Sequence, residues 1–198
     1  MAIALITGAS RGIGKATALL LAQEGYTVVV NYHHNISAAM AVVNEIVVLG
    51  GKAVALGADI SDEAQVMAMF DGIDRLAEPL TALVNNAGIL FAQSTVEHLT
   101  AGRINQVLST NVTGYFLCCR EAVKRMSYRH GGKGGAIVNV SSAASRLGAP
   151  GGICGLCRLE RGGGHPDHRT VAGSGGAGNS RQRRASRLYL YRDARVGR

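Results

Sequence analysis

The sequence predicts an α/β fold built on a doubly wound parallel sheet, and three observations lead to it. Short strands that are apolar on both faces alternate with amphipathic helices over residues 1–150, which is typical of a parallel sheet covered by helices on both sides. A glycine-rich turn, Gly8–Gly14, lies between the first strand and the first helix, as in nucleotide-binding βαβ units. The alternation stops after Pro150, so the expected Rossmann-type sheet is incomplete on its C-terminal side.

The first βαβ unit accounts for the segment up to Asn31. Ala2–Thr7 is a short apolar strand that enters the glycine turn, and Lys15–Glu24 follows with helical periodicity. Gly25 is suited to end this helix, because glycine readily adopts the left-handed conformation found after a helix C-terminus. Tyr26–Asn31 is a second apolar strand. The residues expected on the buried side of the helix are Ala16, Leu19, Leu20 and Ala22.

The same alternation continues to residue 150. Gly50 and Gly51 are expected to end the second helix, and Ser61 to cap the third. Further helices are expected at Ser37–Leu49, Asp62–Leu76 and Thr100–Arg129. Further strands are expected at Lys52–Leu56, Leu80–Asn85 and Ala136–Val140. We therefore expect residues 1–150 to form one dinucleotide-binding domain whose parallel strands are joined by right-handed crossovers.

Residues 151–198 differ sharply from this domain in composition and charge. They contain ten Arg and eleven Gly but no Lys, Phe or Met. Eleven basic and ten acidic residues precede them, whereas the tail holds ten basic and three acidic residues, so almost all of the net charge of +8 belongs to the tail. A segment of this composition buries too little apolar surface to fold by itself, and we expect it to be disordered.

The start of the chain and its cysteines favour a cytoplasmic protein. The first strand begins at residue 2, which leaves no room for a signal peptide, and no apolar run has the length of a transmembrane helix. Cys118 and Cys119 lie in a predicted helix, where they are expected to pack as thiols in a reducing compartment. No membrane partner is expected.

The turn Thr7-Gly8-Ala9-Ser10-Arg11-Gly12-Ile13-Gly14 is a candidate phosphate site. Glycines let the backbone approach a pyrophosphate closely, and the following helix directs N–H donors and the positive end of its dipole toward it. The spacing G-x-x-x-G-x-G differs from G-x-G-x-x-G, and a tight turn without a ligand is the alternative. The position of the turn after the first strand of a βαβ unit favours a dinucleotide.

The residues after the second strand favour NADP over NAD. NAD sites usually place an Asp or Glu there to hold the ribose 2′-hydroxyl. This chain has Asn31-Tyr32-His33-His34, so no carboxylate would repel a 2′-phosphate. Arg11, in the glycine turn, could pair with that phosphate.

Together these residues resemble the short-chain dehydrogenase/reductase family. The motifs that carry the resemblance are Thr7–Gly14, Asp59 after the third strand, Asn85-Asn86-Ala87-Gly88 after the fourth, Asn111 in the long helix and Ser141-Ser142 after the fifth. The resemblance implies that the cofactor phosphates are held by Gly8, Ser10, Arg11, Gly12, Ile13 and Gly14. It also implies that Asp59 and Ile60 flank the adenine, and that Asn86, Ala87 and Gly88 line the nicotinamide side.

The chemistry implied by the resemblance is hydride transfer between the nicotinamide and a small-molecule carbonyl or alcohol. In the family a Tyr is the general acid and base, and a neighbouring Lys lowers its pKa. A Ser binds the substrate oxygen, for which Ser142 is favoured over Ser141, and an Asn that matches Asn111 supports a proton-relay water. Leu156 and Glu160 stand where the Tyr-x-x-x-Lys pair is expected, and this pair occurs nowhere in the chain. We therefore expect the chain as written to be inactive.

A change of reading frame near Gly151 explains the tail. Gly152–Arg161 can be encoded so that the frame one nucleotide later reads Glu-Tyr-Val-Asp-Tyr-Ala-Ala-Ser-Lys-Gly, which restores the missing pair. Asn179–Gly197 can be encoded so that the same frame reads Ile-Arg-Val-Asn-Ala-Val-Arg-Pro-Gly-Phe-Ile-Tyr-Thr-Glu-Met-His-Ala-Ser-Gly, which resembles the next strand and Pro-Gly turn of the family. We interpret the tail as frameshifted.

Other interpretations of the chain remain open at this stage. Cys154, Cys157, His165 and His168 are residue types that bind zinc, but their spacing is too short for a zinc finger, and we expect no metal. The Arg/Gly tail could bind RNA through charge, but it lacks interleaved Phe, and we expect no specific nucleic-acid partner. A non-catalytic dinucleotide-binding module is the stronger alternative. Because the frame change removes a helix that commonly builds the family dimer, we expect no family-type homo-oligomer.

Overall fold

A computed structural model describes residues 1–92, 94–142 and 188–192 of the chain. Its strands are β1 (Ile3–Ile6), β2 (Thr27–Tyr32), β3 (Lys52–Gly57), β4 (Leu80–Asn85), β5 (Ala136–Val140) and β6 (Leu188–Arg192). Its α-helices are α1 (Gly12–Gln23), α2 (Ile36–Val48), α3 (Glu63–Asp74), α4 (Ala101–Leu108) and α5 (Gly114–Met126). The predicted α/β fold class, a doubly wound parallel sheet, is confirmed.

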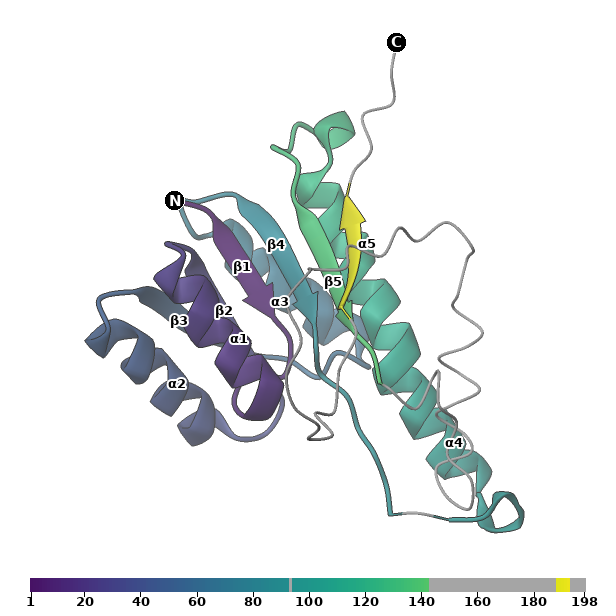
Figure 1. Ribbon diagram of the computed structural model, residues 1–198. Helices are drawn as coiled ribbons and strands as arrows, with labels where there is room; N and C mark the ends of the chain where they lie inside the picture. Colours follow the sequence, from purple (N-terminus) through teal and green to yellow (C-terminus); the bar gives the residue numbers. More distant parts are fainter. Residues whose placement is uncertain (93, 143–187, 193–198) are drawn as a thin grey trace, which may run out of the picture.

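The strands form one sheet in the order β3-β2-β1-β4-β5-β6, and the first five are parallel. The chain moves outward from β1 to β3 and then crosses back to β4, so the direction of winding reverses between β1 and β4. Figure 1 shows the strands side by side, with the carboxyl ends of the five parallel strands along one edge. In such sheets ligands bind at this edge, beside the point of reversal.

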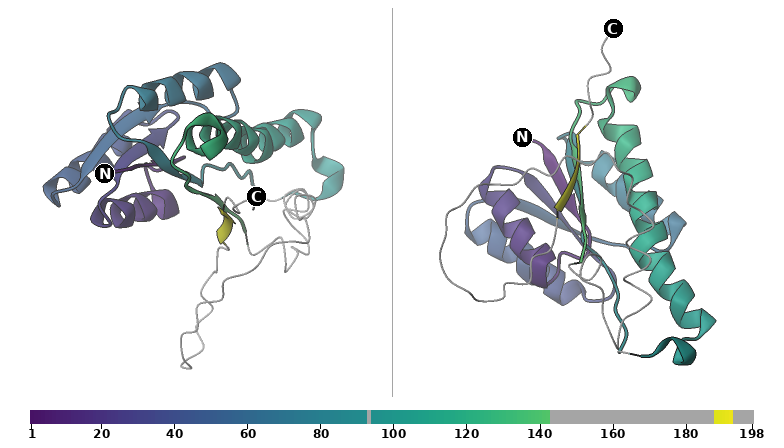
Figure 2. Two further views of the ribbon diagram at one scale, coloured as in Figure 1. Left: turned by 90° about the horizontal axis from the view of Figure 1, so that it is seen from above. Right: turned by 45° about the vertical axis from the view of Figure 1, so that its right-hand side comes forward.

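Two apolar cores lie on opposite faces of the sheet because successive strand residues point to opposite sides. Ile3 and Leu5 of β1 pack with α3 and α5, whereas Ala4 and Ile6 pack with α1 and α2. Figure 2 shows the two pairs of helices on the two faces. The strands are therefore apolar on both faces over most of their length, as the sequence predicted for a sheet covered on both sides, and the polar residues Asn31, Asn85 and Asn139 lie near their carboxyl ends.

The predicted helix Thr100–Arg129 is divided in the structure. It consists of α4, the π-helical turn η2 (Ser109–Thr113), α5 and the 3₁₀ turn η3 (Tyr128–His130). Another 3₁₀ turn, η1 (Val96–His98), precedes α4. The apolar periodicity continues through η2, so it gave no sign of the wider turn.

The predicted buried side of α1 was only half correct. Leu19 and Ala22 pack against the core, but Ala16 is exposed and Leu20 is 62% exposed. The fully buried positions are Gly14 and Ala18. These two small residues lie one turn apart on the same side of α1. Because they let the helix approach the sheet closely, this side of α1 faces the sheet.

Within the tail the structure describes one element, β6. Residues 188–192 pair antiparallel with β5 at the end of the sheet. Their sequence, Leu-Tyr-Leu-Tyr-Arg, is rich in types that favour strands, which the overall composition of the tail concealed. Residues 151–187 and 193–198 lie outside the part of the chain that the structure describes.

A buried carboxylate, Glu121, fastens α5 to α3. Its oxygens accept hydrogen bonds from Arg120 Nε at 2.9 Å, Lys124 Nζ at 2.8 Å and Arg125 Nη1 at 3.0 Å. Arg125 also binds both carboxylate oxygens of Asp74 on α3, at 2.7 and 2.6 Å. Burial alone would raise the pKa of Glu121, but the hydrogen bonds from the three cations outweigh it and hold the pKa below its ordinary value.

We expect Glu121→Gln to lower the free energy of unfolding by about 2 kcal/mol at neutral pH, because hydrogen bonds to charged groups are lost from a buried site. Glu97→Gln is the control, since Glu97 is exposed and meets only His98 at 4.0 Å. Because the folded pKa of Glu121 is lowered, its contribution is full above the unfolded pKa of about 4.3 and is lost as the pH falls through the folded value. Urea denaturation across this range measures both effects. An equal loss of stability in both variants would contradict the assignment.

Candidate functional site

The predicted site residues gather at the carboxyl edge of the sheet. β1, β2 and β4 run parallel in adjacent positions, and the segments that leave them are the glycine turn, the His33-His34 segment and Asn86–Gly88. β5 pairs with β4 through Asn139 opposite Asn85, so Ser141 and Ser142 leave the sheet beside the same edge.

The glycine turn is shaped to bring backbone close to a ligand. Gly8 and Gly12 have φ angles of 62° and 58°, in the left-handed region that glycine adopts without strain. A Cβ on Gly14 would lie 2.5 Å from Asn86 Nδ2 and 2.6 Å from Gly8 O, whereas a Cβ on Gly12 would meet nothing within 4 Å. Gly14 is therefore required by packing, and Gly12 leaves open space at the start of α1. This is the geometry that a pyrophosphate needs.

Thr7 and Asn86 join the glycine turn to the segment after β4. The Thr7 hydroxyl accepts hydrogen bonds from the backbone N–H groups of Asn86 and Ala87, at 2.9 and 3.0 Å. The Asn86 amide donates to the carbonyl oxygens of Thr7 and Gly8, at 2.9 and 3.2 Å. These four bonds fix the two candidate cofactor segments relative to each other.

Asn31, near the end of β2, joins the glycine turn to the end of β3. It is 2% exposed, its Oδ1 accepts from Gly8 N at 3.2 Å, and its Nδ2 donates to the carbonyl oxygens of Leu56 and Ala58, each at 3.2 Å. Ile60 is likewise buried, in the core beside α5. Neither side chain lines the open edge, so each would affect a cofactor by positioning the backbone around it.

Basic groups predominate where the sequence predicted the cofactor ribose. Arg11 is exposed at the N-cap of α1, with no carboxylate partner in the described residues. The rings of His33 and His34 stack with their centroids 3.4 Å apart, and His33 Nε2 lies 3.5 Å from Asp59 Oδ2. Asp59 Oδ1 accepts from both the backbone and the hydroxyl of Ser61, at 2.9 and 2.8 Å. The Asp59 carboxylate is thus bound by Ser61 and lies near His33.

Asn111 lies in the π turn and grips the segment that follows Gly88. Its Oδ1 accepts from Ile89 N at 2.9 Å, and its Nδ2 donates to Ile89 O at 3.0 Å. A Cβ on Gly88 would lie 3.5 Å from the same Oδ1. Single π turns inside α-helices often occur at functional sites, and this one directs Asn111 to the nicotinamide side that the resemblance predicted.

A second buried amide, Asn85, lies behind this segment. Its Nδ2 donates to Asn139 Oδ1 at 2.9 Å and to Cys119 Sγ at 3.2 Å, while its Oδ1 has no hydrogen-bond partner within the part of the chain described. Burial, with a smaller contribution from the neighbouring Cys119, raises the pKa of the Cys118 thiol to about 12. Cys118 is therefore a protonated core residue, in keeping with the packing role predicted for it.

Among the described residues no three metal-ligating side chains come together, and no helix has the length and apolar character needed to cross a bilayer. The zinc candidates Cys154, Cys157, His165 and His168 and the positions Leu156 and Glu160 lie outside the described residues.

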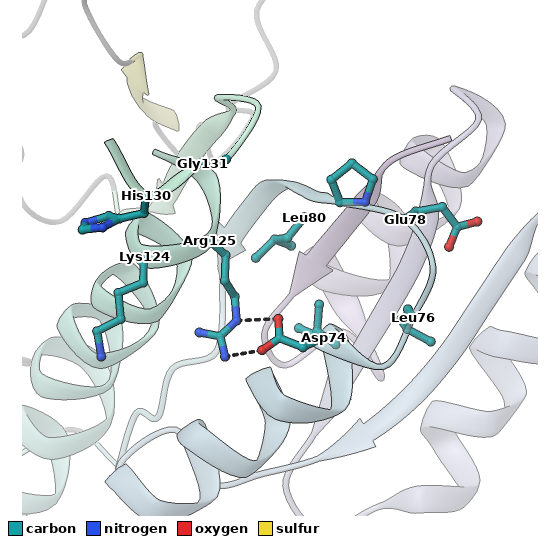
Figure 3. A pocket seen from close by; sticks show the side chains of 11 residues that line it. Asp74, Leu76, Glu78, Leu80, Lys124, Arg125, His130 and Gly131 are labelled. Atoms are coloured by element: carbon teal, nitrogen blue, oxygen red, sulfur yellow. Dashed lines mark hydrogen bonds and ion pairs between the residues drawn. The ribbon is translucent and has the colours of Figure 1, made fainter. Parts of the chain in front are cut away.

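A cavity of about 330 Å³ lies at the opposite edge of the sheet. Figure 3 shows Lys124, Arg125 and His130 on one side of it, with Asp74 and Glu78 across from them. Arg125 and Asp74 bind each other across the cavity. It therefore belongs to the contact between α3 and α5 and lies far from the glycine turn.

The sequence model described as short chain dehydrogenase matches residues 2–154. The chain belongs to the short-chain dehydrogenase family. A solved structure of a short-chain dehydrogenase/reductase mutant from Serratia marcescens superimposes with a TM-score of 0.74 at 31% identity, covering 81% of this chain and 63% of that one.

Several curated relatives of the chain are named as oxidoreductases, reductases or dehydrogenases. An uncharacterized oxidoreductase of Escherichia coli K12, YgfF, is 75% identical over 151 residues, which are 76% of this chain and 61% of YgfF. A 3-oxoacyl-(acyl-carrier-protein) reductase of Synechocystis is 42% identical over 75% of this chain and 59% of its own length. A 3beta-hydroxysteroid dehydrogenase of Mediterraneibacter gnavus is 43% identical over 75% of this chain and 52% of its own length. The chain thus spans about three fifths or less of these relatives.

Sequence motifs found the turn and the segment after β4, but they missed the residues that connect them. Thr7 was quoted as part of the motif and not assigned a role, although a Thr that ends a buried strand is a recognisable signal. The buried pair Asn85 and Asn139 was also missed. Both residues end or nearly end an apolar strand, where a polar side chain must find a partner.

We expect Gly14→Ala to reduce the free energy of unfolding by about 3 kcal/mol and to abolish dinucleotide binding, because the new Cβ overlaps Asn86 and the backbone of Gly8. Gly102→Ala is a matched control, since a Cβ there meets nothing within 4 Å and helix α4 should gain about 0.5–1 kcal/mol. Urea denaturation and cofactor titration measure the two effects. Normal binding by Gly14→Ala would exclude the proposed contact between turn and cofactor.

Proposed function

We propose that the chain is an NADP-binding short-chain oxidoreductase in which the cofactor site is present and the catalytic Tyr and Lys are missing. The observation that carries this proposal is the connected edge of β1, β2 and β4, in which Thr7, Asn31 and Asn86 hold the turn open for a pyrophosphate. No Tyr-x-x-x-Lys pair accompanies it in the sequence. Binding is therefore expected without turnover.

The preference for NADP rests on charge. Arg11, His33 and His34 belong to the two segments that would flank the ribose 2′-group of a bound cofactor, and the nearby Asp59 accepts hydrogen bonds from Ser61. A 2′-phosphate would meet one permanent cation and two imidazoles, whereas a 2′-hydroxyl would find no carboxylate to accept its proton. The proposed phosphate contacts are made by Gly8, Ser10, Arg11, Gly12, Ile13 and Gly14.

The residues that remain can perform only part of the reaction. A bound nicotinamide would supply or accept the hydride. Asn86, Ala87 and Gly88 would line its carboxamide side, and Asn111 would fix their position through Ile89. Ser142, or else Ser141, would donate a hydrogen bond to the substrate oxygen. No described residue is placed to exchange the proton of that oxygen, so Asn111 and Ser142 would hold a substrate without converting it.

The composition of residues 151–198 supports a change of reading frame near codon 151. The match to the family ends at residue 154, which agrees with a frame change shortly before that point. The names of the relatives, an oxoacyl reductase and a hydroxysteroid dehydrogenase, support a small carbonyl or alcohol as the substrate of the uninterrupted protein. We infer a cytoplasmic location and no family-type homo-oligomer for the chain as written.

We expect the purified chain to bind NADP at least tenfold more tightly than NAD, a difference of about 1.4 kcal/mol. Arg11→Gln should lower the affinity for NADP more than the affinity for NAD and so reduce this ratio about threefold or more, because the 2′-phosphate contact is lost in addition to the phosphate contact that both cofactors share. Arg129→Gln is the control, since Arg129 is exposed near the opposite edge of the sheet. Calorimetric titration of both cofactors gives the ratio. Tighter binding of NAD by the wild type would refute the NADP assignment.

We expect removal of one nucleotide near codon 151 to restore NADPH-dependent carbonyl reduction, because the hidden frame encodes Tyr-x-x-x-Lys. The chain as written should bind NADPH without consuming it. Replacing the restored Tyr by Phe is the control, and it should abolish turnover while preserving binding. Sequencing of the locus and an absorbance assay for NADPH decide the matter. Turnover by the chain as written would show that it is a competent enzyme without the pair.

A non-catalytic dinucleotide-binding module is the second candidate. It is favoured by the same connected turn, which needs no catalytic residue to hold a cofactor. The two candidates differ in one respect: a module that evolved for binding has no functional reading frame hidden behind residue 151. The sequence of the locus therefore separates them. RNA binding by the tail is less favoured, because the tail contains no Phe between its basic residues.

A further inference from the structure

One arginine beside the candidate site has a contact that the proposed reaction does not use. The guanidinium of Arg103, in the first turn of α4, lies over the ring of Phe91 with its central carbon 5.3 Å from the ring centroid. Its Nη2 donates to the carbonyl oxygen of Ala92. Arg103 thus reaches from the helix back to the segment that leaves β4.

This segment adjoins the nicotinamide side of the site. It begins at Ile89, whose backbone N–H and C=O are both bound by Asn111, and continues through Leu90 and Phe91. Leu90 is 61% exposed and Phe91 is 38% exposed. Two partly exposed apolar side chains and the Arg103 guanidinium therefore lie on or against the segment that follows Gly88, which would adjoin the substrate in the proposed reaction.

The charge of Arg103 is not neutralised in the described part of the chain. No carboxylate lies within 4.0 Å of it, and the nearest acid in sequence, Glu97, meets His98 instead. A cation in the first turn of a helix is also opposed by the positive end of the helix dipole. The Arg103 guanidinium is half-buried, has no carboxylate partner in the described residues and lies near the positive end of the helix dipole. Because it also has N–H donors that make no hydrogen bond in the described residues, it is suited to bind an anion.

We infer that Arg103 is a specificity-determining residue that selects carbonyl substrates bearing a carboxylate at the far end of an apolar chain. One edge of the guanidinium is engaged by Ala92 O, and the remaining N–H donors can pair with both oxygens of a carboxylate. Leu90 and Phe91 would contact the apolar chain. Since this inference concerns the substrate, it rests on the proposed oxidoreductase function.

The position of Arg103 sets the length of such a substrate. Arg103 and Asn111 are eight residues apart on one continuous helical segment, so they are separated by on the order of 10 Å along the axis. Asn111 adjoins the reacting end of the site. The carboxylate should therefore lie about 10 Å from the carbonyl carbon, which excludes short 2-oxo acids and suits a medium-length oxo acid.

Calorimetry on the full chain saturated with NADP tests this inference with 9-oxodecanoate and its neutral methyl ester. The wild type should bind the acid about tenfold more tightly than the ester, the effect of one charge-assisted contact of about 1.4 kcal/mol. Arg103→Gln should reduce the ratio to about one while leaving the affinity for the ester unchanged. Arg103→Lys should keep part of the preference, because it retains the charge without the fork. Arg75→Gln, at the C-cap of α3, should behave like the wild type.

The outcomes separate this inference from the function on which it rests. Failure of the wild type to bind NADP would overturn the proposed function. Normal NADP binding with equal affinity for acid and ester, or no measurable affinity for the acid, would overturn the role of Arg103 alone. An unchanged ratio in Arg103→Gln would do the same. The affinity of each variant for NADP shows that it is folded.

Discussion

The close approach of the glycine turn to the end of β4 is the constraint on which the rest of the site depends. A Cβ on Gly8 would lie 2.9 Å from Ala87 Cα, and one on Gly14 would lie 2.5 Å from Asn86 Nδ2. Only glycine lets these backbones meet, and the Thr7 hydroxyl and the Asn86 amide then hold them together. The start of α1, the end of β2 and the nicotinamide-side segment all take their positions from this contact. The shape of the candidate site is therefore a property of packing between segments and does not depend on residues beyond β5.

Most of the fold could be predicted from the sequence, because apolar strands and glycine-ended helices are local signals. Leu80–Asn85 and Ala136–Val140 were predicted with the bounds observed. The buried side of α1 was predicted only in part. Leu19, Leu20 and Leu21 point in three different directions around the helix, and the small residues Gly14 and Ala18 determine which side packs against the sheet. The π turn at Ser109–Thr113 and the pairing of β6 were missed. Both depend on contacts with distant segments, which periodicity and composition do not contain.

The candidate site divides in the same way. Residues that contact a ligand through their backbone, such as Gly8 and Gly12, belong to motifs and could be found from spacing. Residues that support them, such as Asn85 and Asn139, act through pairs far apart in the sequence. Asn31 and Ile60 were predicted to contact the cofactor, and the structure shows that both side chains are buried. Motifs thus indicate where a ligand lies more readily than which side chains touch it.

The π turn also fixes the rotational register of the protein's longest helical segment. Each residue of an α-helix turns the chain by about 100°, and a π turn accommodates one residue more than an α turn. Removal of one residue between Ser109 and Thr113 would let α4 and α5 join as a regular helix and would rotate every residue of α4 relative to the sheet. Arg103 would then leave Phe91, and Ile104 would take a new direction. The wider turn therefore sets the rotation of α4 relative to α5. The residues of α4 keep their present directions only while the number of residues in the turn is unchanged.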